Sequence, residues 1–438
     1  MKYFLPDSQD LVDPSFDFRR ETRASTRVRQ RDDVYAHELF RQPPYDGLLV
    51  SKAIVDGHGG GVGRYTIAQR HRLLRAGVRD FLRLDATQQP LETMGDCGAF
   101  SYVREKVPPF SVSDVLEFYV DGGFDYAISV DHVILGYKPE YDTHLPAVDV
   151  VPEDWRERQA LTFDLAAEFK RAHTKQGLRF VPLGVAQGWS PASYAQAVET
   201  LQKIGYRYIA LGGLVPLKTT EIVDVVRAAS EKRHSDTRFH LLGVTRLDQF
   251  ELFSAAGVAS FDSTSPLRQA FKDDKDNYHV AGGAYSAVRV PQVSANPRLK
   301  KAILSGVVDQ AVAMEHERDC LRLLRAYNAR EAPLETVLHA LRRYEELFDG
   351  KRDRTESNRR VLEDRPWEQC ACDVCQALGI HVVLFRGAER NRRRGLHNTF
   401  VFYQRLQQEL GQAPSAMGAP DWATTPSKEE QENVSSCN

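Results

Sequence analysis

The stretch Gly257–Arg268, GVASFDSTSPLR, joins a short apolar run to a single carboxylate and a turn. The run Val258–Phe261 has the length and residue types of a buried strand, and Asp262 follows at its carboxyl end. The residues Ser263–Pro266 favour turns, so the chain leaves the strand there. In a (β/α) barrel, the carboxyl ends of the strands form the active site. Taken alone, Asp262 is equally well explained as a cap of the next turn.

Apolar runs of strand length recur along the chain and alternate with amphipathic segments. We predict strands at Gly47–Val55, Phe81–Leu84, Tyr126–Val130, Arg179–Val185, Tyr208–Leu211, His240–Val244 and Val258–Phe261. We predict helices at Thr66–Ala76, Val112–Tyr119, Trp155–His173, Pro191–Ile204, Thr220–Glu231 and Leu247–Ala256. Strands that alternate with helices indicate a parallel sheet, and this many units in roughly 220 residues favours a (β/α)8 TIM barrel. A doubly wound open sheet is the alternative.

The fold class is therefore α/β, and we predict four regions. Residues 1–44 show no clear periodicity and form an N-terminal arm, and residues 45–296 form the barrel. Residues 297–410 form a helical, zinc-binding C-terminal module with long helices at Pro297–Tyr327 and Pro333–Phe348. Residues 411–438 are rich in Pro, Ser, Thr and Glu, which predicts a disordered tail.

Charge is balanced over the whole chain but concentrated locally. The 438 residues are 42% hydrophobic and 27% charged, with a net charge of -2, which excludes a uniformly basic coat. Arginines cluster in 19–31, 64–83 and 386–394, and one such run alone is more often a solvated face. Three runs favour a surface for nucleic-acid phosphates. The first candidates are Arg19, Arg20, Arg23, Arg27, Arg29, Arg31, Arg386, Arg390, Arg392, Arg393 and Arg394.

Hydropathy argues against a membrane protein. No stretch approaches the roughly 18 consecutive apolar residues that a membrane helix requires. The first residues, MKYFLPDSQD, lack the apolar core of a signal peptide, so we expect a cytoplasmic protein with no membrane partner.

Three of the six cysteines cluster in CACDVC, as Cys370, Cys372 and Cys375, and His397 follows. Three thiolates and an imidazole suit tetrahedral Zn²⁺, and four protein ligands leave no position for water or substrate. The pattern therefore predicts a structural zinc site, with His381 as an alternative fourth ligand. The competing interpretation is three buried free cysteines and an unrelated histidine.

Further polar residues follow the predicted strands. Asp96 lies in the glycine-bounded loop GDCGAF, Asp131 ends YAISVDH, Gln187 follows PLGVA, and Gly212-Gly213 closes IALGG. Any one of them is more often a turn residue than a site residue. Their recurrence at the same place in successive units predicts one shared pocket, because the carboxyl ends of parallel barrel strands converge.

Together these motifs resemble those of a known protein family. GDCGAF, VDH, GVAQG, LGGL, FDSTSP and CACDVC with its histidine, in this order, resemble the tRNA-guanine transglycosylase superfamily over about residues 1–410. The N-terminal FLPDSQDLVDPSFDF more closely resembles its DNA-acting branch, which belongs to 7-deazaguanine DNA-modification systems. The resemblance implies a zinc-bearing (β/α)8 barrel that exchanges guanine in DNA for a 7-deazaguanine.

The resemblance also implies roles for residues and partners. Asp262 would be the nucleophile at C1′ of the sugar and Asp96 the general acid/base. Asp131 would bind the pyrimidine edge of the base. Further substrate-binding candidates are Gln187, Gly212, Gly213, Leu214 and Phe100, and the zinc ligands are Cys370, Cys372, Cys375 and His397. The implied partners are DNA, the incoming base, guanine as the leaving group, and other proteins of the modification system.

The chain departs from the family pattern at two places. The usual Ser-Gly-Gly-Phe-Gln loop is Cys-Gly-Ala-Phe-Ser here, so Ala99 and Ser101 alter the pocket floor. Where bacterial tRNA enzymes have an acid that meets an aminomethyl group, the matching residue here is Lys218, which favours the neutral 7-cyano-7-deazaguanine (preQ0). The alternatives are a tRNA-acting transglycosylase, a non-catalytic nucleic-acid-binding relative and an unrelated barrel hydrolase.

Overall fold

The computed structural model describes residues 1–58, 63–87, 89–143, 150–272 and 274–411. These residues form two compact units. The first, the barrel unit, contains Met1–Gln9, Tyr45–Thr264 and Leu406–Gln412. The second unit contains Asp10–Pro44 and Ser265–Arg405. The predicted disordered tail lies outside the described residues except for Gly411.

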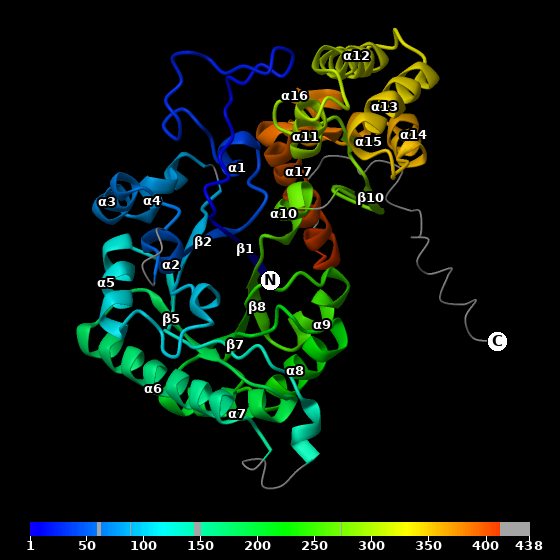
Figure 1. The fold of residues 1–438 in the computed structure, drawn as a ribbon. Coiled ribbons are helices and arrows are strands. Elements are labelled where there is room, and N and C mark those ends of the chain that lie inside the picture. Colours follow the sequence, from blue (N-terminus) through cyan, green and yellow to red (C-terminus); the bar gives the residue numbers. More distant parts are fainter. Residues whose placement is uncertain (59–62, 88, 144–149, 273, 412–438) are drawn as a thin grey trace, which may run out of the picture. The chain divides into compact units, whose positions relative to one another are not determined.

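The barrel unit is a closed barrel of parallel strands in which each strand pairs with the next and β8 pairs with β1 (Figure 1). The strands are β1 (Lys2–Pro6), β2 (Gly47–Ser51), β3 (Glu92–Asp96), β4 (Tyr126–Ile128), β5 (Val181–Ala186), β6 (Tyr208–Leu211), β7 (Arg238–Leu241) and β8 (Val258–Asp262). The helices between them are α2 (Lys52–Asp56), α3 (Ile67–Ala76), α4 (Val78–Leu82), α5 (Val112–Gly122), α6 (Glu153–Gln176), α7 (Pro191–Ile204), α8 (Thr219–Glu231) and α9 (Phe250–Ala255). The predicted (β/α)8 barrel is confirmed.

Apolar side chains from successive strands fill the barrel interior. Each strand contributes to the interior because its side chains alternate between the two faces of the sheet, so every second residue points inward. The cluster consists of Phe4, Leu49, Met94, Ile128, Leu183, Val185 and Ala210, each at most 3% exposed. Burial of such side chains contributes roughly 1.5–3 kcal/mol each, so the packed interior fixes where the strands end.

Three predictions about the strands are wrong. The predicted strand Gly47–Val55 ends at Ser51, and its remaining residues belong to helix α2. Residues 1–44 are not wholly an arm, because Lys2–Pro6 is the strand that closes the barrel, with Tyr3 and Phe4 buried. The predicted strand Phe81–Leu84 is largely helix α4, in which Val78, Phe81 and Leu82 are buried at helical spacing. The missing strand is instead Glu92–Asp96.

The second unit is mainly helical. Its elements are α1 (Ala36–Leu39), α10 (Ser265–Lys272), β9 (Tyr278–Val280), β10 (Gly283–Tyr285), β11 (Val288–Arg289), α11 (Pro297–Leu304), α12 (Gln310–Asn328), α13 (Leu334–Asp349), α14 (Thr355–Asp364), α15 (Pro366–Gln369), α16 (Asp373–Leu378), β12 (Leu384–Phe385) and most of α17 (Gly387–Glu409). The unit begins at Ser265, so the predicted boundary at residue 296 is too late. The predicted helix Pro297–Tyr327 is two helices, because Gly306 has positive φ and Asp309 caps α12 by accepting the N–H of Val312.

Candidate active site and metal centre

The predicted polar residues of the barrel unit gather at its carboxyl mouth, the end where the strands finish. Asp96 is the last residue of β3 and Asp262 the last residue of β8. Asp131 lies three residues after β4, Gln187 directly follows β5, and Gly212 directly follows β6. Closure of the barrel therefore brings residues from distant parts of the sequence to one mouth.

The Asp262 carboxylate is held through one oxygen. It is 8% exposed, and its Oδ1 accepts the backbone N–H of Gly243 at 3.1 Å and the ring Nε2–H of His240 at 3.2 Å. No residue in the described ranges donates a hydrogen bond to Oδ2. The group therefore has one oxygen fixed by the barrel and one available to a substrate.

Asp96 has different surroundings. The Ser51 hydroxyl donates to its Oδ2 at 2.7 Å, and the two residues are direct neighbours in the β2–β3 register. Burial raises the pKa of Asp96, and the negative charge of Asp262 raises it further. Hydrogen bonds from Ser51 and the Gly98 backbone oppose this shift. Two nearby carboxylates with unequal environments suit one proton donor and one charged group.

Asp131 and Gln187 form a buried polar pair. The Gln187 Nε2–H donates to Asp131 Oδ2 at 2.7 Å, and Gln187 Oε1 accepts the N–H of Ile134 at 3.2 Å. The Cys97 thiol donates to Asp131 Oδ1 at 3.4 Å. Burial raises the pKa of Asp131 to about 7, and the charge of Asp96 adds to the effect. The carboxylate therefore changes its protonation near neutral pH.

Two glycines leave room for this pair. A Cβ at Gly212 would lie 2.2 Å from Gln187 Nε2, so any side chain there would displace the amide from Asp131. Gly213 has φ of +74°, and a Cβ there would lie 2.6 Å from the Ile134 carbonyl oxygen. The next residue, Leu214, is fully buried, whereas the Phe100 side chain is 61% exposed on the turn after Asp96.

The second unit holds the predicted metal cluster. Ligand atoms of Cys370, Cys372, Cys375 and His397 all lie within 4.8 Å of one another. The His397 Nδ1 lies 3.6, 3.4 and 3.3 Å from the three sulfur atoms in that order. Tetrahedral zinc, with Zn–S of about 2.3 Å and Zn–N of about 2.0 Å, separates sulfur and nitrogen ligands by about 3.6 Å. The cluster could therefore hold a metal ion, and its donors and spacing suit zinc.

Neighbouring groups orient the ligands. The other ring nitrogen of His397, Nε2, lies 2.8 Å from the His279 carbonyl oxygen, so Nε2–H donates and Nδ1 presents its lone pair to the cluster. Tyr278 stacks on the His397 ring at 4.2 Å, and its hydroxyl lies 3.2 Å from Cys375 Sγ. The alternative ligand, His381, is not in the cluster, and its ring nitrogen lies 3.4 Å from the Arg390 guanidinium.

Comparison with known proteins identifies the family. No family model matches the chain. However, the chain is 50% identical over 414 residues to a DNA-guanine transglycosylase of Salmonella montevideo, which covers 94% of this chain and 97% of that protein. The chain belongs to the guanine transglycosylases. It is therefore a pentosyltransferase, an enzyme that acts on the bond between a base and its sugar.

Two more distant relatives support the wider superfamily. A queuine tRNA-ribosyltransferase of Psychrobacter cryohalolentis is 26% identical over 189 residues, which is 43% of this chain and 49% of that protein. A tRNA-guanine(15) transglycosylase of Thermococcus onnurineus is 25% identical over 212 residues, which is 47% of this chain and 32% of that protein. The resemblance to the superfamily that the motifs indicated is confirmed.

The arginines of α17 and the turn before it lie inside the second unit of this guanine transglycosylase. Arg386, Arg390, Arg393 and Arg394 are each at most 4% exposed. Arg386 and Arg390 pair with Glu21, and the others bond to a carboxylate or to backbone carbonyls of the same unit. A buried guanidinium requires such partners, and these contacts leave it unavailable to solvent. The burial of these four side chains contradicts their predicted contact with phosphates, and Arg392 is half-buried beside the Leu11 carbonyl.

The arginines of the 19–31 segment are more accessible. Arg27 is half-buried and pairs with Asp33, but the others are exposed. The exposed candidates are Arg19, Arg20, Arg23, Arg29 and Arg31. Separately, none of the helices in the described ranges has both the length and the hydropathy needed to cross a membrane.

Sequence reasoning missed several residues that contact the two acids of the enzyme. His240 and Ser51 bond directly to Asp262 and Asp96, and Ser260 bonds to His240. One signal was present, since Ser260 and Asp262 are two positions apart on one strand and must share a face. Their pairing with His240 depends on the β7–β8 register, which is irregular between Phe239 and His240.

Proposed function

We propose that the protein exchanges guanine in DNA for 7-cyano-7-deazaguanine (preQ0) through a covalent intermediate on Asp262. The observation that supports this best is the pair of unlike carboxylates at one mouth of the barrel. Asp262 has one oxygen fixed and one available, while the pKa of Asp96 is raised by burial and by its acidic neighbour. The choice of DNA as the substrate polymer is supported by the Salmonella montevideo relative, which is 50% identical and is named a DNA-guanine transglycosylase.

In the first step, Oδ2 of Asp262 attacks C1′ of the sugar as the C1′–N9 bond to guanine breaks. Protonated Asp96 donates its proton to the departing guanine, so the base leaves neutral and Asp96 becomes a carboxylate. The sugar is then esterified to Asp262. Such a retaining displacement passes through an oxocarbenium-like state that the nearby carboxylate stabilises.

In the second step, preQ0 occupies the vacated pocket. The Asp96 carboxylate removes the proton from N9 of preQ0 as that nitrogen attacks C1′, and the ester to Asp262 breaks. Both acids return to their starting protonation states, so the cycle needs no ATP and no redox partner. The target guanine must first leave its stack, at a cost of a few kcal/mol.

Asp131 and Gln187 are the proposed readers of the base. Ionised Asp131 accepts from the N1–H and the 2-amino group of guanine, two donors that preQ0 shares. Gln187 fixes the orientation of Asp131, and the glycines at 212 and 213 allow the base to approach the backbone. The exposed ring of Phe100 is free to stack on the base.

Lys218 is the proposed determinant of the 7-substituent. Its side chain is exposed at the start of α8, and its backbone N–H bonds to Glu221 at 2.7 Å. An ammonium group repels the aminomethyl ammonium of a competing base and tolerates a neutral nitrile. This selectivity favours preQ0.

Exposed arginines of the barrel unit are proposed to contact the DNA backbone. The segment 64–76 has four exposed arginines and no acid, and the connection that contains it follows β2 at the carboxyl mouth. They are Arg64, Arg70, Arg72 and Arg75. The exposed arginines of 19–31 in the second unit are further candidates. Phosphate contacts of this kind weaken steeply with salt.

Zinc is the proposed occupant of the cysteine cluster, with a structural role. Four protein ligands complete a tetrahedral shell, and a closed shell offers no site for substrate. Zinc would therefore hold CACDVC, β9 and α17 of the second unit together.

The central prediction is base exchange on DNA. With preQ0 and guanine-containing DNA, mass spectrometry of the digested nucleosides should show the preQ0 deoxynucleoside, and labelled guanine should enter DNA but not tRNA. Asp262→Asn should lower the rate at least about 10³-fold, and Asp96→Asn about 10²-fold or more.

Asp121→Asn, on the exposed face of α5, is the matched control and should exchange normally. Labelling of tRNA alone would overturn the choice of polymer. Preference for the aminomethyl base would overturn the role of Lys218. Full activity of Asp262→Asn would overturn the covalent mechanism.

The pKa of Asp131 predicts a pH effect on base binding. Because this pKa is raised to about 7, the group gains a proton below pH 7 and loses its acceptors for guanine. The KM for the free base should therefore rise about tenfold per pH unit below 7. The same shift makes protonation of Asp131 favour the folded state as the pH falls from about 7 to about 4, so Asp131 itself does not promote unfolding in this range.

The Asp131→Asn variant separates protonation of Asp131 from other effects of pH on the enzyme. At pH 8 this variant should raise the KM by about tenfold or more, since hydrogen bonds to a charged group are lost, and should flatten the pH profile. Steady-state kinetics from pH 5.5 to 8.5 measure both. An unchanged, pH-independent KM in the parent protein would contradict the role of Asp131.

Zinc analysis of cysteine variants tests the ligand assignment of the cluster. Elemental analysis should find about one zinc per chain, and Cys372→Ser should lose most of it and lower the thermal midpoint of the second unit. Cys320→Ser, at a buried cysteine outside the cluster, should keep its zinc. Normal zinc content in Cys372→Ser would refute the ligand assignment.

A further inference from the structure

Asp262 is the end of a hydrogen-bonded chain through the barrel interior. The ring Nε2 of His240 lies 3.2 Å from Asp262 Oδ1, and its Nδ1 lies 2.6 Å from the Ser260 hydroxyl oxygen. The Ser260 oxygen lies 2.5 Å from the Tyr208 hydroxyl. His240 and Ser260 are fully buried, and they are register partners on β7 and β8.

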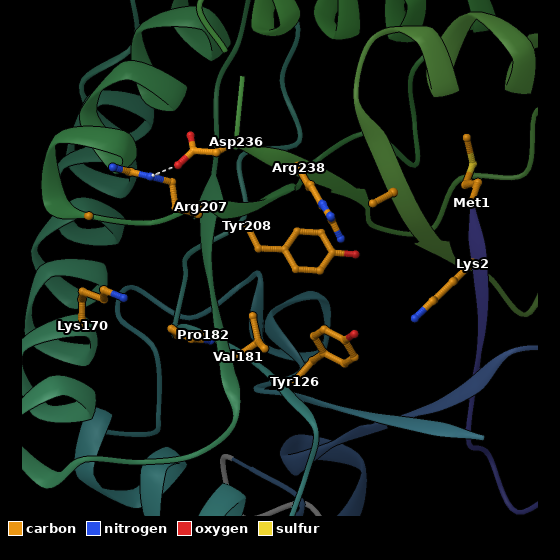
Figure 2. Close-up of a pocket in the computed structure, with 12 residues that line it drawn as sticks. Met1, Lys2, Tyr126, Lys170, Val181, Pro182, Arg207, Tyr208, Asp236 and Arg238 are labelled. Atoms are coloured by element: carbon orange, nitrogen blue, oxygen red, sulfur yellow. Dashed lines mark hydrogen bonds and ion pairs between the residues drawn. The ribbon is translucent and has the colours of Figure 1, made fainter. Parts of the chain in front are cut away.

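This series of hydrogen bonds, from Tyr208 to Asp262, crosses the barrel from end to end. Tyr208 is the first residue of β6 and lines a cavity of about 520 Å³ at the amino mouth, where the strands begin. Figure 2 shows its ring in this cavity beside Tyr126, with Arg238 and Lys2 nearby. Asp262 lies at the opposite, carboxyl mouth. A change at the Tyr208 hydroxyl is therefore remote from the pocket that would hold the base.

The donors and acceptors of the chain agree with one arrangement of protons. Asp262 Oδ1 is an acceptor, so His240 Nε2 must bear a hydrogen. Burial raises the pKa of Tyr208, so its phenol keeps its proton and can donate it to the Ser260 hydroxyl oxygen. In this arrangement the Ser260 hydroxyl donates to Nδ1 of His240, and Nδ1 is the acceptor. This arrangement uses every proton of the hydrogen-bonded series and places the ring hydrogen of His240 on Nε2.

We propose that His240, held in this tautomer by Ser260 and Tyr208, is a positioning residue that presents Oδ2 of Asp262 to the sugar. The inference rests on the proposed role of Asp262 as nucleophile. His240 and Gly243 fix Oδ1 from two directions, which prevents rotation of the carboxylate and leaves Oδ2 for attack. A small misplacement of a nucleophile lowers the rate steeply without changing substrate binding.

The kinetic test uses four variants of the full-length protein. His240→Leu should lower kcat for guanine exchange about 10- to 100-fold and leave KM for base and DNA within about twofold. His240→Gln, which keeps an N–H donor, should recover part of the loss. Ser260→Ala should lower kcat, and its effect should not add to that of His240→Leu, because both remove one interaction.

The fourth variant is Tyr208→Phe, which removes the terminal donor and should lower kcat severalfold. Tyr126→Phe is its matched control, since Tyr126 lines the same cavity but its hydroxyl faces Glu92 at 3.4 Å, outside the chain. It should exchange at the parent rate. Equal losses in the two tyrosine variants would indicate a general structural effect and overturn the proposal.

A spectroscopic readout tests the tautomer directly. Nitrogen NMR of the labelled parent protein should give His240 a protonated Nε2 and an unprotonated Nδ1, and Ser260→Ala should change this pattern. An imidazolium or an Nδ1–H tautomer in the parent overturns the assignment. If His240→Leu keeps full kcat while Asp262→Asn is inactive, the positioning role fails and the proposed function stands. If Asp262→Asn is active, the proposed function itself fails.

Discussion

Pairing between β1 and β8 closes the barrel, and the arrangement of the site depends on this closure. Without it, Asp262 would end the edge strand of an open sheet, far in sequence and in pairing order from Asp96 on β3. With it, Phe4 of β1 is the register partner of Asp262, and β3 lies only three strands from β8 around the ring. The apolar interior then holds all the strand ends at fixed positions.

The closed mouth places acids in unequal environments. Asp96 and Asp131 both have raised pKa values, chiefly through burial and further through a neighbouring carboxylate. Asp262 instead receives two hydrogen bonds on one oxygen. The proposed proton donor, nucleophile and base-binding carboxylate are therefore all aspartates, and they differ because each strand end offers different neighbours.

Much of this arrangement was predictable from local patterns. The alternation of apolar runs and amphipathic segments gave the barrel, and the acids at strand ends gave the candidate site. The Cys370–Cys375 spacing predicted a metal cluster whose geometry suits zinc. The strand Lys2–Pro6 was missed because five residues before a turn have little periodicity, and only tertiary pairing identifies them as a strand.

Other features depend on contacts that no local pattern contains. The run 386–394 looked like an exposed basic patch, but Glu21, far away in the sequence, pairs with Arg386 and Arg390 inside the second unit. The proposed role of His240 depends likewise on the register between β7 and β8. Sequence spacing identifies which residues are chemically suitable, and the fold determines which of them face a substrate.

The most direct test of the account is the site of the covalent bond. Enzyme mixed with guanine-containing DNA in the absence of an incoming base is denatured, digested with protease and nuclease, and mapped by mass spectrometry. The account predicts a guanine-free sugar esterified to the peptide that contains Asp262. A sugar attached to Asp96 or to any other residue would contradict it.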